Sequence, residues 1–274
     1  MKDVAIHIFL ACLFIISSAK LAGQNHNHRF YYSFNYKTDT LGSSSNDILV
    51  LSVNDKENIF LSSKFLETDS LNSVHQHKKQ YINPQYNSIL QYSKENDLFS
   101  SYKKLDMNYY HYDFKKKLSW KIHSQKKELL SFMVQKATTT YGGRNWTAWF
   151  CNDIQLPYGP YVFHGLPGLI LELYDDEDNF RYTLIKSIKS SPDHFKLDYI
   201  FEDKPIKIKA KDWKAIQLNY YNNPLYDYKT IGWVMYHKNG QPYTSQDYRN
   251  LEIQIKEGIK RYNNPIELDE KIQY

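Results

Sequence analysis

Residues 142–174 read GGRNWTAWFCNDIQLPYGPYVFHGLPGLILELY, and we expect the rest of the fold to be organised around them. Glycine is the residue that permits a positive φ angle or a close approach of the backbone to another group. This stretch holds five of the ten glycines, namely Gly142, Gly143, Gly159, Gly165 and Gly168. The sequence Leu166-Pro167-Gly168-Leu169 predicts a type II turn, with proline at the second position and a glycine of positive φ at the third. Gly159-Pro160 marks another bend just upstream.

A β-hairpin is predicted directly after this turn. Residues 169–174 form a short apolar run of strand length, and strand-forming residues resume at 180–185. The five residues between them, 175–179, read DDEDN and are polar throughout. We therefore expect two antiparallel strands joined by an acidic loop.

The hexapeptide Gly165-Leu166-Pro167-Gly168-Leu169-Ile170 resembles the signature of the GLPGLI family of secreted Gram-negative bacterial proteins. The flanking residues 135–138, 143–144, 146–150 and 159–163 are similar to that family as well, and so is the ending NNPIEL at 263–268. The resemblance covers nearly all of the chain after its first residues. It implies a class of protein and a compartment but no mechanism, because the family has no established activity and no agreed catalytic residues.

We take the family-motif residues as the candidate binding site for a ligand or partner, with either a structural or a functional role. They are Arg144, Trp146, Trp149, Gly159, Pro160, His164, Gly165, Leu166, Pro167 and Gly168. Trp146 and Trp149 are three residues apart, so in a strand they face opposite sides and at least one of them belongs to the core. Arg144 follows two glycines and has a simpler interpretation as the partner of an acidic residue.

The N-terminus predicts export. Residues 1–23 are typical of a secretory signal peptide, with Lys2 ahead of an apolar run over 4–16 and small residues at 17–19 and 22–23 for cleavage. The run is shorter than the roughly 20 apolar residues of a membrane-spanning helix. Cys12 lies inside the apolar run, which argues against lipoprotein processing. We expect a periplasmic or secreted protein in which residues 24–274 form a single β-rich domain, since no linker or internal repeat divides them.

Composition agrees with a globular β-rich protein. Aromatic residues make up 16% of the chain, and strands favour them. A mean hydropathy of −0.65 argues against a membrane-embedded chain. The formal charge of +5 is mild, and the basic residues are not gathered as in a nucleic-acid-binding protein, so we expect no nucleic-acid partner.

The local patterns predict strand after strand, followed by two helices. The expected strands are 28–36, 48–53, 58–65, 109–114, 118–122, 129–137, 146–150, 169–174, 180–185, 195–201 and 206–209, with short edge strands at 81–82 and 88–92 in an otherwise weakly patterned region over 67–108. Helical spacing is found at 211–221 and from about 245 to 262, where the apolar stripe is expected to cover the sheet. The predicted fold is α+β and β-rich, a curved and mostly antiparallel sheet with a C-terminal amphipathic helix.

Four constellations have a chemical as well as a structural interpretation. The acidic loop at 175–179 offers oxygen ligands for Ca²⁺ but lacks the spacing of a known calcium loop. The pair His75 and His77 lacks a third zinc ligand. A chain cleaved after Gly23 would begin Gln24-Asn25-His26, a pattern that suits Cu²⁺. Cys151, the one cysteine after the signal peptide, is either an inert buried thiol or a nucleophile with His164 as its base. The structural interpretation is preferred each time, so we expect no metal site and no cofactor.

Two functions from different classes remain open. One is an exported, non-catalytic protein of the cell envelope that binds a hydrophobic ligand on an apolar face, a peptide along a free sheet edge, or an envelope partner. The other is a hydrolase with a site near residues 142–174, where His164, Arg144, Glu172 and Asp153 would have to meet. No catalytic motif is present, so the sequence alone does not assign a catalytic residue or say what the protein does.

Overall fold

The computed structural model describes residues 27–39, 41–74, 81–189, 197 and 200–274. The predicted signal peptide, the Gln24-Asn25-His26 terminus, the His75/His77 pair and most of the predicted strand at 195–201 lie outside them. Within the described residues, twelve strands form one sheet in the order β12-β6-β5-β4-β3-β2-β1-β11-β10-β9-β8-β7. The strands are β1 (His28–Tyr36), β2 (Ser45–Val53), β3 (Glu57–Ser62), β4 (Ile89–Ser93), β5 (Leu98–Leu105), β6 (Asn108–Phe114), β7 (Lys121–Leu129), β8 (Phe132–Tyr141), β9 (Arg144–Cys151), β10 (Leu169–Asp175), β11 (Phe180–Lys189) and β12 (Ile206–Lys207).

The sheet consists of two antiparallel meanders joined at the middle. Strands β1 to β6 follow one another in space, as do β7 to β11, and β1 pairs with β11 to join the two sets. The two-residue strand β12 runs parallel to β6, which makes the sheet mixed but mostly antiparallel. The prediction of a β-rich, mostly antiparallel fold is confirmed.

β1 shows why this sequence forms a central strand. Its even-numbered side chains Phe30, Tyr32, Phe34 and Tyr36 are all buried, so one face of the strand is a continuous aromatic row. The Phe34 ring stacks on Tyr182 of β11 with the ring centroids 4.4 Å apart. Cross-strand aromatic pairs of this kind stabilise sheets, and here they join the two meanders.

A connection between β9 and β10 fills this same face of the sheet. We call residues 152–168 the central loop. Its side chains Val162, Phe163 and Leu166 are buried in the main hydrophobic core. Phe163 packs against Trp146 of β9, whereas the neighbouring His164 packs against Phe99 of β5. The central loop therefore contacts both meanders.

The opposite face of the first meander is covered separately. Helix α2 (Ser63–Val74) begins where β3 ends, and its Phe65 is buried with Leu61 and Ile89 in a second, smaller core. The sequence patterns missed this helix, because the predicted strand at 58–65 runs across its start. They also missed β5 and placed an edge strand at 88–92, whereas β4 lies inside the sheet between β3 and β5.

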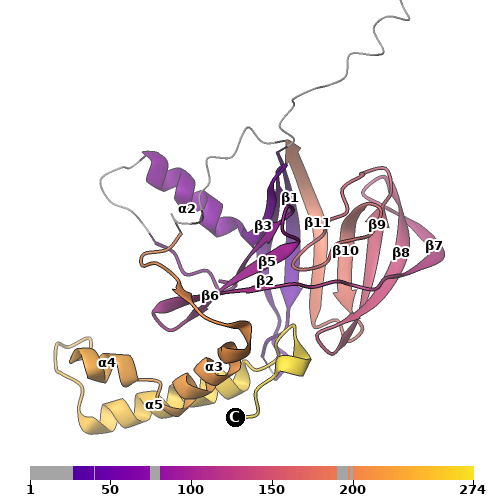
Figure 1. Cartoon of the computed structure of the whole chain (residues 1–274). Coiled ribbons are helices and arrows are strands. Elements are labelled where there is room, and N and C mark those ends of the chain that lie inside the picture. Colours follow the sequence, from indigo (N-terminus) through magenta and orange to yellow (C-terminus); the bar gives the residue numbers. More distant parts are fainter. Residues whose placement is uncertain (1–26, 40, 75–80, 190–196, 198–199) are drawn as a thin grey trace, which may run out of the picture.

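Three further helices gather at one end of the sheet near the C-terminus, α3 (Trp213–Asn222), α4 (Tyr226–Ile231) and α5 (Ser245–Arg261) (Figure 1). Thr244 and Asp247 form a reciprocal capping box at the start of α5, which explains why that helix begins there. α5 lies beside α3 and has no fully buried residue. The described residues do not show the predicted cover of a sheet face by α5, and the central loop fills the face that holds the aromatic row of β1. None of the helices in the described part of the chain is long and apolar enough to cross a membrane.

The glycines of the hexapeptide do not serve the predicted type II turn. Gly165 has a positive φ of +91°, whereas Gly168, where that turn needs a positive φ, does not have one. A Cβ atom on Gly168 would lie 1.9 Å from the carbonyl oxygen of Cys151. A Cβ atom on Gly159 would lie 2.6 Å from Cδ1 of Ile170. Close packing against β9 and β10, rather than turn geometry, explains Gly168 and Gly159.

Gly168→Ala is therefore expected to destabilise the protein. The added methyl group meets backbone that cannot move without disturbing β9, so we expect a loss of about 3 kcal/mol or more in the free energy of unfolding, measured by urea denaturation. Gly258→Ala in α5 is the matched control. A Cβ atom there meets nothing within 4 Å, and alanine favours a helix by roughly 0.5–1 kcal/mol over glycine. Equal stabilities of the two variants would contradict this account of Gly168.

Candidate functional site

Arg144 is the most heavily bonded of the predicted site residues. Its guanidinium is buried at the start of β9, and Nη1 donates to Oδ2 of Asp175 at 2.9 Å. Nε donates to the carbonyl oxygen of Ile266 at 3.1 Å, and Nη2 donates to the carbonyl oxygen of Pro265 at 2.9 Å and to Oδ1 of Asn264 at 2.5 Å. All three nitrogens of the planar guanidinium thus donate hydrogen bonds, Nη1 to the acidic loop and Nε and Nη2 to residues near the C-terminus.

The two glycines before Arg144 bring the C-terminus into this contact. A Cβ atom on Gly142 would lie 2.8 Å from Cα of Glu267, and the carbonyl oxygen of Gly142 accepts a hydrogen bond from the Leu268 amide at 2.6 Å. We call residues 263–270 the C-terminal segment. The GGR and NNPIEL sequences, although about 120 residues apart, form one structural unit.

Glu267 of the C-terminal segment lies among tyrosines. Its Oε1 accepts hydrogen bonds from the hydroxyl of Tyr141, at 2.8 Å, and from the hydroxyl of Tyr161. Burial and the nearby Glu267 raise the pKa of Tyr141 far above its usual value, so this phenol stays neutral and donates. Burial alone would lower the pKa of Lys103, but the attraction of Glu267 and Tyr112 outweighs it and leaves that pKa raised.

The other motif residues are mostly packing residues. Trp146 is fully buried and Trp149 lies half-buried on the opposite face beneath Lys127, as the three-residue spacing predicts. The Nδ1 atom of His164 lies 2.8 Å from the carbonyl oxygen of Val162. Pro160 and Leu166 are buried, whereas Gly165 and Pro167 are exposed.

The residues required by the hydrolase hypothesis have separate partners. The His164 ring packs on Tyr92 and Phe99. None of these three residues is among the hydrogen-bond partners of Arg144 given above. Glu172 pairs with Lys127 at 2.5 Å and with Arg181 at 2.8 Å. Asp153 is exposed, and Cys151 is a buried free cysteine whose carbonyl oxygen lies against Gly168.

The acidic loop has a structural role in the described part of the chain. Asp175 is buried, and its Oδ1 also accepts a hydrogen bond from the Phe180 amide at 2.8 Å, which closes the β10–β11 hairpin. The expectation that Arg144 pairs with an acidic residue is confirmed. Among the described residues, no group of three or more His, Cys, Asp or Glu side chains is placed to hold a metal ion.

Two adjoining cavities lie between the sheet and the C-terminal helices, and together we call them the interlayer cavity. Their volumes are about 490 and 230 Å³. They share the lining residues Thr38, Lys103, Trp213, Gln217, Pro265 and Glu267. The C-terminal segment held by Arg144 therefore forms one wall of this space.

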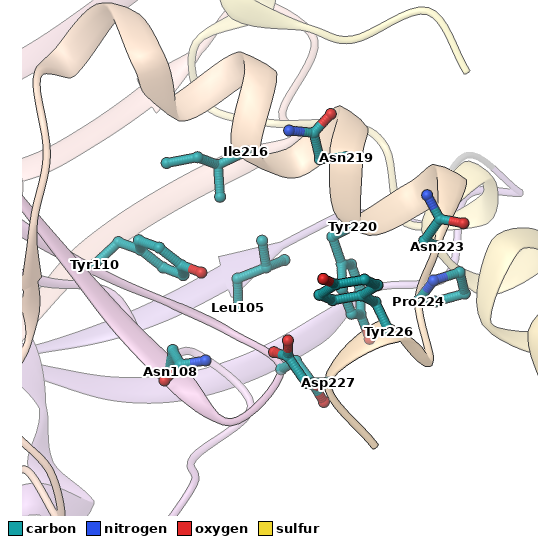
Figure 2. A pocket seen from close by; sticks show the side chains of 11 residues that line it. Leu105, Asn108, Tyr110, Ile216, Asn219, Tyr220, Asn223, Pro224, Tyr226 and Asp227 are labelled. Atoms are coloured by element: carbon teal, nitrogen blue, oxygen red, sulfur yellow. The ribbon is translucent and has the colours of Figure 1, made fainter. Parts of the chain in front are cut away.

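A second hollow of about 390 Å³ opens between the β5–β6 turn and helices α3 and α4, and we call it the side pocket. Figure 2 shows the side chains that line it, with Asp227 from α4 facing the β5–β6 turn across the opening. Neither hollow was predictable from local sequence patterns, because each is lined by segments that are far apart in the sequence.

Arg144→Lys is expected to lower the free energy of unfolding by about 3 kcal/mol, because an ammonium group cannot satisfy three fixed directions and buried partners are left unpaired. Urea denaturation monitored by tryptophan fluorescence measures this. Arg249→Lys is the matched control, since Arg249 is exposed on α5 and its guanidinium contacts the side chain of Gln246. A change of under about 0.5 kcal/mol in both variants would contradict the role given to Arg144.

Comparison with known proteins adds a short family match and a likeness of fold. A family model described as "Protein of unknown function (Porph_ging)" matches residues 141–172, a stretch that includes Arg144 and the whole hexapeptide. No curated protein matches the chain. Solved structures of PNGF-II in two crystal forms are similar to it, each with a TM-score of 0.52 and 13% sequence identity. The similarity covers 70% of this chain but only 33% and 32% of those chains, so this chain spans about a third of their length. At this identity the likeness is one of fold alone.

Proposed function

We propose that this is an exported, non-catalytic protein of the cell envelope that binds a hydrophobic ligand in the interlayer cavity. Export rests on the signal-peptide pattern of residues 1–23 and on the resemblance to a family of secreted proteins. The binding role rests on one observation, a cavity of ligand size whose walls combine apolar and aromatic side chains with amide and charged groups.

The walls of the interlayer cavity are suited to a molecule with an apolar body. Trp213 of α3 and Ile255 and Ile259 of α5 line the larger part. Lys103 and Glu267 lie where the two parts meet and can orient a polar end of the ligand. The ligand of this proposal is therefore an amphiphile whose apolar part lies against the helices.

We also propose that α5 is an amphipathic helix and that the sheet is curved, as the sequence predicts. Along α5, Leu251, Ile255 and Ile259 are half-buried, whereas Glu257 and Lys260 are exposed, which supports an amphipathic helix with its apolar side toward the cavity. Contacts of one central loop with both meanders support a curved sheet. In this view the family-motif residues hold the frame and the C-terminal segment in place, and the ligand binds beside them.

Gly258 offers a direct test, because it lines the larger cavity and a Cβ atom on it meets nothing within 4 Å. Gly258→Phe is expected to fill part of the space and to weaken binding of the uncharged fluorescent probe N-phenyl-1-naphthylamine at least tenfold, by roughly 1.4 kcal/mol. Gly258→Ala is the control and should bind the probe as the wild type does. Probe binding that is absent in the wild type, or equal in all three proteins, would overturn the proposed site.

A further inference from the structure

The side pocket differs chemically from the interlayer cavity. Its wall on the sheet side is the β5–β6 turn, with Leu105, Asp106 and Asn108, and its other walls come from α3 and α4. Three tyrosines line it, Tyr110 of β6, Tyr220 of α3 and Tyr226 of α4 (Figure 2). A volume of about 390 Å³ lies within the range of small-molecule sites.

The charge in this pocket is of one sign. Asp106 and Asp227 are the charged residues among those that line it, and none of its lining residues is Lys, Arg or His, in a chain whose formal charge is +5. Partial burial and repulsion from Asp227 raise the pKa of Asp106, and hydrogen bonds from the Tyr228 hydroxyl and the Met107 amide, together with Lys104, oppose this rise only in part. Two carboxylates thus line the same space, and no cationic side chain lines it with them.

The aromatic lining adds to the preference for a cation. The faces of tyrosine rings carry negative potential and attract ammonium groups within about 6 Å. Burial and the nearby Asp106 raise the pKa of Tyr220 to about 12, so its phenol stays neutral at physiological pH. Tyr226 is 65% exposed and lies at the mouth, where it can cover an entering group.

We propose that the side pocket binds an organic ammonium cation, with Asp106 and Asp227 supplying the countercharge and Tyr110, Tyr220 and Tyr226 enclosing the alkyl groups. An anion would be repelled by both carboxylates. A neutral ligand would leave their mutual repulsion in place. A bare divalent ion finds no third acidic or histidine ligand among the described residues. The chemistry is shared by free amines and by lysine side chains of peptides.

Calorimetric titration of the full chain tests this with matched pairs of ligands. Choline is compared with its neutral isostere 3,3-dimethylbutan-1-ol, and the peptide acetyl-Gly-Lys-Gly-amide with the same peptide carrying norleucine. At least one ammonium probe should bind roughly tenfold or more tightly than its neutral partner. If only choline binds better than its neutral isostere, the natural ligand is a free ammonium compound. If the lysine peptide binds better than its norleucine counterpart, the natural ligand is a peptide. If neither probe binds better than its isostere, the proposal is wrong.

The variant Asp106→Asn/Asp227→Asn removes the charge and keeps the shape. Asp106 has a φ of +52°, and asparagine tolerates this left-handed conformation, so the turn is preserved. The control Glu95→Gln/Glu128→Gln makes the same change in net charge at two exposed residues outside the pocket. We expect ammonium binding to fall at least about tenfold in the first variant and to stay within about twofold of wild type in the second. Equal binding by the two variants would overturn the assignment.

Discussion

The buried guanidinium of Arg144 is the interaction on which the rest of this structure depends. A buried charge is tolerated only when it is paired and hydrogen-bonded, and Arg144 meets this condition with partners from the acidic loop and the C-terminal segment. Because Asp175 also closes the β10–β11 hairpin, the ion pair connects β9 to the hairpin, and the other hydrogen bonds of Arg144 add the C-terminal segment. Loss of Arg144 would therefore disturb three parts of the fold together.

The residues that pack the sheet and the central loop together differ from most of the residues that line the cavities. The family-motif residues pack the central loop against the two meanders and hold Glu267 against Tyr141. The interlayer cavity and the side pocket lie instead between the sheet and the helices α3 to α5. A short family match over residues 141–172 covers Arg144 and the hexapeptide but none of the helices that line these cavities.

Local sequence patterns were sufficient where strand-forming residues are concentrated. The aromatic strand β1 and the β10–β11 hairpin were predicted from such runs, and the opposite faces of Trp146 and Trp149 were predicted from the period of two in a strand. Strand β5 was missed because its Ser-Ser-Tyr-Lys-Lys run has no such period. The role of Gly168 was misjudged because the constraint is a carbonyl oxygen across the loop rather than its own φ angle. The C-terminal partners of Arg144 were not predictable, since contacts about 120 residues away leave no local pattern.

Amide hydrogen exchange of the wild-type protein tests the anchoring of the C-terminal segment most directly. The Leu268 amide donates to the carbonyl oxygen of Gly142. If Arg144 couples the segment to the core, this amide opens only with the sheet and exchanges as slowly as the amides of β9 and β10. Exchange as fast as that of the exposed helix α4 would show that the segment opens independently, and would contradict the account.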